Sequence, residues 1–108
     1  MVRDELSDED ILNLLEEITN YIGSNPPENL TFKTITLREE GFFQVLAHGW
    51  INSHRIHTSV LHVEFVGGKV QIYHDGTDID VMGWLLDRGV SKQSFELVHL
   101  PPEELALL

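Results

Sequence analysis

The feature that most constrains this chain is a run of β-type segments separated by turns of only a few residues. These segments cover residues 30–37, 42–50, 55–65 and 70–74. A parallel connection needs a crossover of about a dozen residues or more, so turns this short require antiparallel neighbours. The clearest turn is Val66-Gly67-Gly68-Lys69, because paired glycines accept the positive φ angles of a tight hairpin. The middle of the chain therefore predicts an antiparallel meander.

A helical pattern precedes the meander. Ser7 can cap a helix and Asp10 lies three residues later, which is a capping-box spacing. Apolar residues then recur at the spacing of one helix face. They are Ile11, Leu14, Leu15, Ile18 and Ile22. We predict a helix over residues 8–22, ended by Gly23.

A second helical pattern follows the meander. Thr77 with Asp80 resembles a capping box, and Gly89 closes the segment. Its apolar stripe consists of Ile79, Met82, Leu85 and Leu86. Residues 95–100 form a last short strand, which Pro101-Pro102 ends. This order predicts an α+β domain, in which both helices pack on one face of an antiparallel sheet of four to five strands.

Composition limits the chain to one small cytoplasmic domain over residues 1–108. The hydrophobic fraction of 42% is typical of a folded protein. The absence of cysteine excludes disulfides, thiolate metal sites and thiol nucleophiles. The start carries charged residues, unlike a signal peptide, and no apolar run reaches the roughly 20 residues that span a bilayer. We expect no membrane contact and no cofactor.

The charge disfavours direct binding of nucleic acid. The net charge is −11, from 7 basic and 18 acidic residues. Nucleic-acid binders neutralise phosphates with clustered lysine and arginine, and here no two basic residues are adjacent. The acids concentrate on the first helix and its lead-in, which suggests a surface for a basic protein partner. The proposed surface comprises Asp4, Glu5, Asp8, Glu9, Asp10, Glu16 and Glu17.

Six histidines raise the question of a metal site. They are His48, His54, His57, His62, His74 and His99. On one regular strand His57 and His62 differ in parity, so we expect them on opposite faces. His62 and His74 flank the Gly67-Gly68 turn and can lie close together. No His-x-His or i, i+4 helical pair occurs, so we expect ordinary sheet and surface histidines with no metal bound.

Three carboxylates cluster in the segment from Asp75 to Asp80. The segment lacks the spacing of a calcium loop, so we interpret it as a strand-to-helix turn. In that turn Gly76 supplies a backbone angle that other residues resist, and Thr77 caps the helix. Ser53-His54 lacks the glycine pattern of a nucleophile elbow, so we expect no catalytic residue.

Several short motifs in order resemble the XisI-like family of excision-controlling factors. They are Gly49-Trp50, Arg55-Ile56-His57, His62-Val63, Gly68-Lys69-Val70, Asp75-Gly76-Thr77, Gly89-Val90-Ser91-Lys92 and Val98-His99-Leu100-Pro101-Pro102. The resemblance makes Gly49, Trp50, Gly67, Gly68, Asp75, Gly76, Thr77, Pro101 and Pro102 structural positions. The chain departs from the family at Gln71, Ser91 and Gly41-Phe42, and after Glu103 it lacks the family's basic and aromatic tail.

The resemblance implies a non-catalytic accessory factor that assists site-specific DNA excision beside a recombinase or nuclease-like companion. The alternative is a small ligand-binding or enzymatic domain that uses the histidines and the Asp75-Gly76-Thr77 turn. We further expect a homodimer, because adjacent Phe42 and Phe43 point to opposite faces of one strand and helices cover only one of those faces. Trp50 and Trp84 are then core or interface residues.

Overall fold

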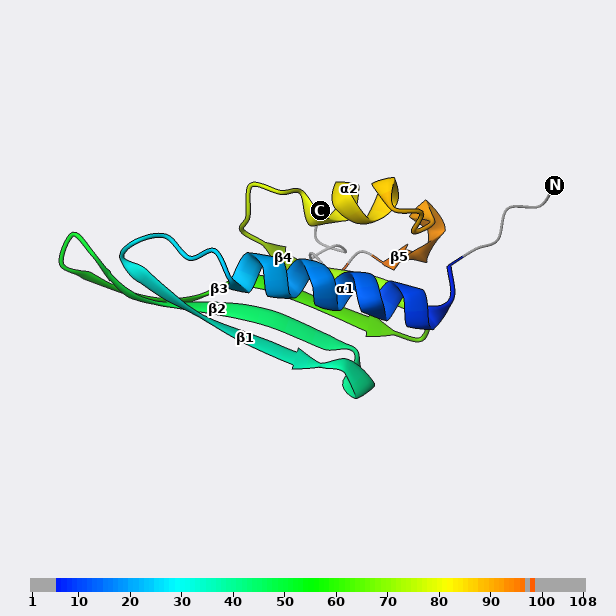
Figure 1. The fold of residues 1–108 in the computed structure, drawn as a ribbon, viewed down its shortest axis with the longest axis horizontal. Coiled ribbons are helices and arrows are strands. Elements are labelled where there is room, and N and C mark those ends of the chain that lie inside the picture. Colours follow the sequence, from blue (N-terminus) through cyan, green and yellow to red (C-terminus); the bar gives the residue numbers. More distant parts are fainter. Residues whose placement is uncertain (1–5, 97, 99–108) are drawn as a thin grey trace, which may run out of the picture.

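The computed structural model describes residues 6–96 and residue 98. These described residues form two α-helices, two short 3₁₀ helices and five strands (Figure 1). In chain order these are α1 (Asp8–Gly23), β1 (Leu30–Leu37), η1 (Arg38–Glu40), β2 (Phe42–Ile51), β3 (His54–Val66), β4 (Lys69–Asp75), α2 (Val81–Asp87), η2 (Lys92–Ser94) and β5 (Phe95–Glu96). The α+β fold class and the four strands of the meander are therefore confirmed.

The sheet follows the order of the chain. Its strands lie side by side as β1-β2-β3-β4-β5, and the first three pairings are antiparallel. Gly67 and Gly68 both have positive φ, 60° and 78°, as the hairpin turn between β3 and β4 requires. Asn52 and Ser53 make the β2–β3 turn with φ of 50° and 70°, a conformation that glycine adopts more easily.

The fifth strand differs from the expected antiparallel arrangement. β5 pairs with β4 in parallel, with Val70 opposite Phe95 and Gln71 opposite Glu96. The reason is the connection, because α2 and η2 return the chain across the sheet before β5 begins. The sequence-based strand over residues 95–100 is described only to Glu96; residues 97, 99 and 100 lie outside the described part.

Both helices cover the same face of the sheet (Figure 1). Phe43, Val45 and Ala47 of β2 point toward them and are buried. The core joins α1, the sheet and α2 in one cluster of buried side chains. It consists of Ile11, Leu15, Ile18, Ile22, Phe43, Val45, Leu61, Val63, Val70, Val81, Leu85 and Val90. The opposite face carries no helix within the described residues, and we call it the helix-free face.

The hairpin of β2 and β3 projects beyond the C-terminal end of α1 (Figure 1). We call residues 48–57 of this hairpin the arm. At its base Gly49 is required, because a Cβ there would lie 2.5 Å from the carbonyl oxygen of Asn29. At the C-terminal end of α1, near the base of the arm, Gly23 lies directly against Thr34. None of the helices in the described range is long and apolar enough to cross a membrane.

Candidate functional site

The first turn of α1 is built as the sequence predicts. Ser7 is the N-cap, its hydroxyl accepting the Asp10 N–H at 3.1 Å, while the Asp10 carboxylate accepts the Ser7 N–H at 3.1 Å. The carboxylates at the start of the helix also interact favourably with the positive end of the helix dipole. Asp8 and Glu9 are exposed beside them. Asp4 and Glu5, the other two acids expected here, lie outside the described residues.

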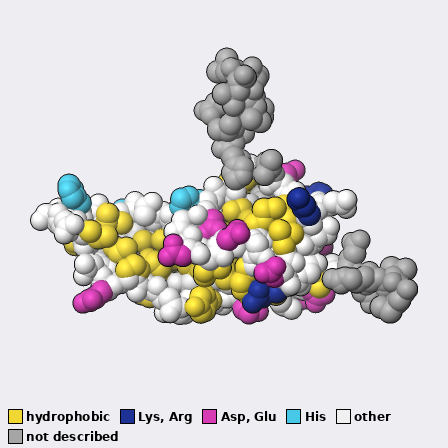
Figure 2. Space-filling view, turned by 90° about the horizontal axis from the view of Figure 1, so that it is seen from above, with side chains coloured by type: hydrophobic (Ala, Val, Ile, Leu, Met, Phe, Trp, Pro, Cys, Tyr) yellow, Lys and Arg dark blue, Asp and Glu magenta, His cyan; other side chains and the backbone are white. Residues whose placement is uncertain are grey.

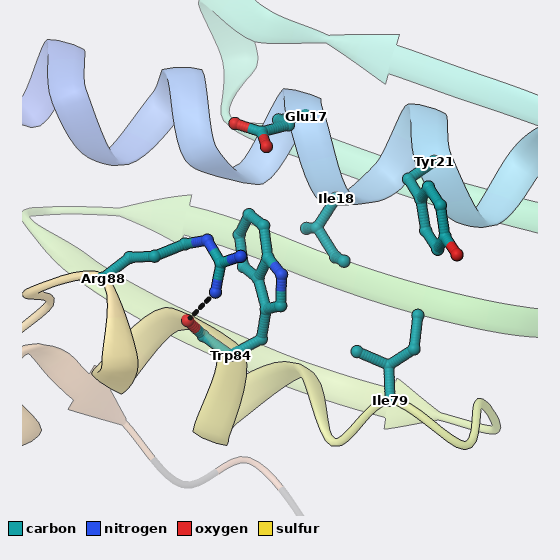
Figure 3. Close-up of a pocket in the computed structure, with 6 residues that line it drawn as sticks. All are labelled: Glu17, Ile18, Tyr21, Ile79, Trp84 and Arg88. Atoms are coloured by element: carbon teal, nitrogen blue, oxygen red, sulfur yellow. Dashed lines mark hydrogen bonds between the residues drawn. The ribbon is translucent and has the colours of Figure 1, made fainter.

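Arg38 divides the acids of α1 into two groups. Its guanidinium binds Glu9 at 2.6 Å and Glu16 at 3.2 Å, so one cation partly neutralises two carboxylates on the flank of α1 nearest β1. Glu17 lies on the other flank, toward α2 (Figure 3). The acidic surface expected from sequence is therefore two surfaces, one bridged to the sheet and one open.

An open groove of about 440 Å³ lies between α1 and α2 (Figure 3). One wall comes from α1 and the other from α2 with its preceding turn. The lining residues are Glu17, Ile18, Tyr21, Ile79, Trp84 and Arg88. The Arg88 guanidinium lies 3.7 Å from the centre of the Trp84 ring and donates a hydrogen bond to the Trp84 carbonyl oxygen at 3.1 Å.

The chemistry of this groove suits an amphipathic segment of another protein. Tyr21 is 59% exposed on one rim, and Trp84 presents a half-buried ring on the other. Between them Ile18 and Ile79 form an apolar floor, and the Glu17 carboxylate offers a partner for a cation. The sequence indicated Glu17 as part of an acidic surface and Trp84 as a core or interface residue. Nothing in the sequence shows that α1 and α2 lie beside each other, so the groove between them was not predicted.

The turn before α2 differs from the sequence prediction in two respects. The helix begins at Val81 with Asp80 as N-cap, whose carboxylate accepts the Gly83 N–H at 3.2 Å, so Thr77 is not the cap. Gly76 does not have a positive φ, so the expected special backbone angle is wrong. A Cβ on Gly76 would instead meet the His74 ring at 2.9 Å.

The Asp75 carboxylate is engaged within its own turn. It accepts hydrogen bonds from the Thr77 N–H at 3.0 Å, the Thr77 hydroxyl at 2.5 Å and the Val81 N–H at 2.8 Å. The Thr77 hydroxyl in turn accepts the Ile79 N–H at 3.2 Å. These contacts connect the end of β4 to the start of α2, which gives Asp75 and Thr77 a structural role.

The histidines form cross-strand pairs. His48 lies opposite His57, and His62 opposite His74, so the expected proximity of the second pair is confirmed. The expectation that His57 and His62 face opposite sides is wrong. A β-bulge places Val60 as an extra residue in β3, which restores both histidines to the helix-free face. His54 lies at the tip of the arm, and His99 is outside the described residues.

These histidines do not assemble with other ligand residues. Within residues 6–96 and 98, no group of three or more histidine, aspartate or glutamate side chains could hold a metal ion. His62 instead contacts Glu64 at 2.8 Å and stacks on Tyr73, with ring centroids 4.5 Å apart. Trp50 is not a core residue, since it is 60% exposed with the Arg55 guanidinium 6.0 Å from its ring centre. Pro101 and Pro102 lie outside the described part.

Taken together, the helices on one face of a meander and the groove beside an acidic helix define a small two-layer α+β domain. The family model described as XisI protein matches residues 1–106 of the chain. The chain therefore belongs to the XisI protein family, as the ordered motifs indicate.

Two solved structures from Anabaena variabilis share the fold. A XisI-like protein superposes with a TM-score of 0.77 at 20% sequence identity, covering 91% of this chain and 92% of that chain. The fdxN element excision controlling factor XisI superposes with a TM-score of 0.69 at 18% identity, covering 87% of this chain and 93% of that chain. The two-layer arrangement is therefore retained at low sequence identity.

Proposed function

We propose that this chain is a non-catalytic accessory factor in the control of DNA excision, which acts by binding a basic companion protein. Family membership supports the role, since a protein of the same fold carries the name excision controlling factor. The observation that carries the mechanism is the open groove between α1 and α2, with the Glu17 carboxylate at its rim. A recombinase or nuclease-like companion is the class of partner that fits.

Charge supports a protein partner over DNA. A net charge of −11 repels a duplex, whereas it speeds encounter with a basic protein. Asp8, Glu9 and Asp10 lie at the exposed start of α1, on the helix that also forms one wall of the groove. A companion whose basic side chains surround an apolar segment would pair with these acids while its apolar segment fills the groove.

The alternative, a ligand-binding or enzymatic site at the Asp75-Gly76-Thr77 turn, is less well supported. Both side chains of the turn that carry oxygen atoms are engaged in hydrogen bonds that hold α2 in place. A catalytic role would require breaking contacts on which the start of a helix depends. The groove, by contrast, is open.

The test is affinity purification of the tagged chain from its native organism, followed by binding measurements with the purified companion. We expect Asp8→Asn, Glu9→Gln and Asp10→Asn together to weaken binding about 10-fold or more, with the larger loss at low salt. The matched control neutralises Glu28, Glu39 and Glu40, which are exposed away from the walls of the groove, and should leave most of the affinity. Equal losses in both triple variants would contradict a specific surface.

Two further measurements separate the groove from general acidity. Tyr21→Ala removes an exposed rim of the groove without changing charge, and should weaken companion binding while the circular dichroism spectrum stays unchanged. A gel-shift of duplex DNA with the pure chain at low salt should show no retention. Tight, salt-sensitive retention of the duplex would overturn the proposal that the companion, not this chain, holds the DNA.

A further inference from the structure

The helix-free face of the sheet exposes an unusual share of large apolar side chains. The alternation along each strand is fixed by the buried residues: Phe43 points to the helices, so Phe42 points away. The same alternation and register place four of the exposed large hydrophobic residues on the helix-free face. They are Leu37, Trp50, Val66 and Tyr73, exposed by 44%, 60%, 49% and 42%.

A row of three rings crosses this face toward the end of the sheet that lies away from the arm. Phe42 of β2 lies 5.1 Å from the His62 ring, and His62 lies 4.5 Å from the Tyr73 ring of β4, measured between ring centroids. Glu64 holds the His62 ring by a 2.8 Å contact, and the Tyr73 hydroxyl donates to the Gln71 side chain at 3.1 Å. These contacts hold the rings in place, so the ring side chains lose little conformational freedom when a partner covers them.

The charge on this face differs from the charge of the whole chain. Its acids within the described strands are Glu64 and Glu96, and the register places three cations on the same face, Lys33, Arg55 and Lys69. The remaining described acids lie on α1, on α2, in the connections and, in the case of Asp75, at the end of β4, where the carboxylate binds the start of α2. The view from above, which does not face the helix-free side, shows acidic side chains mainly over the body and hydrophobic side chains that continue onto the projecting end (Figure 2).

We infer that a second copy of this chain covers the helix-free face. Two copies with a net charge of −11 repel each other wherever acids meet, and on this face that repulsion is smallest. A two-fold axis that lies in the plane between the two sheets and runs across the strands brings the helix-free faces together and aligns the two copies in opposite directions. Arg55, in the arm, then lies over the partner end that carries Glu64 and Glu96, so opposite charges meet beside apolar surface.

The three rings and the exposed apolar side chains provide the main contacts of this interface. Stable dimers bury about 800 Å² on each partner, and aromatic residues dominate their centres. The row from Phe42 to Tyr73 lies toward the end of the sheet that carries Leu37 and Val66, since Leu37 is opposite Phe42, and Trp50 lies at the other end. In the antiparallel arrangement, the rings of one copy therefore face the Trp50 end of the other. The three lysine and arginine residues of this face are spread over β1, β3 and β4 and share it with two acids, so the face is poorly suited to phosphates and we favour a protein copy over nucleic acid.

The experiment measures molar mass by sedimentation equilibrium from nanomolar to high micromolar concentration. We expect the wild-type chain to approach twice its 12.3 kDa mass. Leu37→Glu with Val66→Glu places four added carboxylates in the symmetric interface and should weaken self-association at least about 100-fold. The matched control is Tyr21→Glu, because Tyr21 is 59% exposed on the helix-covered side, and it should leave the dimer intact.

A charge exchange tests the orientation of the two copies. Arg55→Glu alone should shift the equilibrium toward monomer, and adding Glu96→Lys should restore much of the dimer. A 12.3 kDa mass for the wild-type chain at high micromolar concentration would overturn the inference. So would a dimer that Tyr21→Glu breaks and the Leu37/Val66 variant leaves intact. Binding of a fluorescent single-stranded oligonucleotide that Trp50→Ala abolishes would assign the face to nucleic acid instead.

Discussion

Phe42 and Phe43 are neighbours in β2, yet they end in different surroundings. Phe43 is fully buried beneath α1, whereas Phe42 is half-buried and leans on the His62 ring. The same contrast extends over the two faces of the sheet. The helix-covered face holds the core of the monomer, and the helix-free face holds rings and apolar ends that no helix covers in the described chain. The monomer core therefore lies on one side of these strands, and the proposed self-association uses the other side.

The largest expected effect comes from replacing each phenylalanine by alanine. Phe43→Ala leaves a cavity in a closed core and should lower the free energy of unfolding by about 3–5 kcal/mol. Phe42→Ala loses part of one ring contact and should cost about 1 kcal/mol. The measurement is urea unfolding at low protein concentration, where the monomer dominates. Equal losses for the two variants would contradict the difference between the faces.

A smaller effect concerns the closest approach of α1 to the sheet. A Cβ at Gly23 would lie 1.8 Å from the Thr34 hydroxyl oxygen, so Gly23→Ala should cost about 1–2 kcal/mol of unfolding free energy. In a Thr34→Ala background the oxygen is gone, and alanine is the better helix former. The cost should then fall by about half or more. A double-mutant cycle with no coupling between the two positions would argue against this contact.

A third effect tests the link between α1 and the end of β1. Arg38→Met removes two ion pairs with side chains that are partly exposed, so we expect a loss of up to about 1 kcal/mol at low salt. High salt screens these pairs and should reduce the difference between variant and wild type. Lys92→Met is the control, since Lys92 is exposed in η2. An identical response of the control would indicate general charge repulsion rather than this bridge.

The smallest effect is expected on the helix-free face. Leu37→Ser replaces a side chain that is already 44% exposed, so at low concentration unfolding should change by less than about 0.5 kcal/mol. At high concentration the same variant should lower the thermal midpoint, because it weakens a state that association stabilises. If the thermal midpoint of the wild-type chain does not change with protein concentration, association does not stabilise the chain, and this prediction is wrong.

Local patterns predicted most of the fold. The Ser7–Asp10 capping box and the Gly67-Gly68 turn depend on neighbouring residues, and both are as expected. The parallel β5 was missed because its direction depends on how α2 packs. The face of His62 relative to His57 was missed because one extra residue, Val60, resets the alternation, and no pattern in β3 marks a bulge.

The candidate site was predicted only in part, for a similar reason. The acids of α1 are visible in the sequence, but Arg38 binds two of them from 22 and 29 residues away. The groove requires Tyr21 and Trp84 to lie on facing helices, which is a property of tertiary packing. Gly76 shows a different kind of error. A glycine in a turn suggests a positive φ, but Gly76 does not have one. A side chain at this position would instead be too close to the His74 ring.

The sheet order also has a consequence for how the chain folds. β1 to β4 are neighbours both in sequence and in the sheet, so each hairpin closes a short loop at small entropic cost. β5 can join only after α2 has crossed the sheet. During refolding, the outer backbone of β4 therefore stays unpaired longest, and an unpaired strand edge is a template for aggregation. We expect the amides of Val70 and Ile72 to gain protection late in pulsed hydrogen exchange.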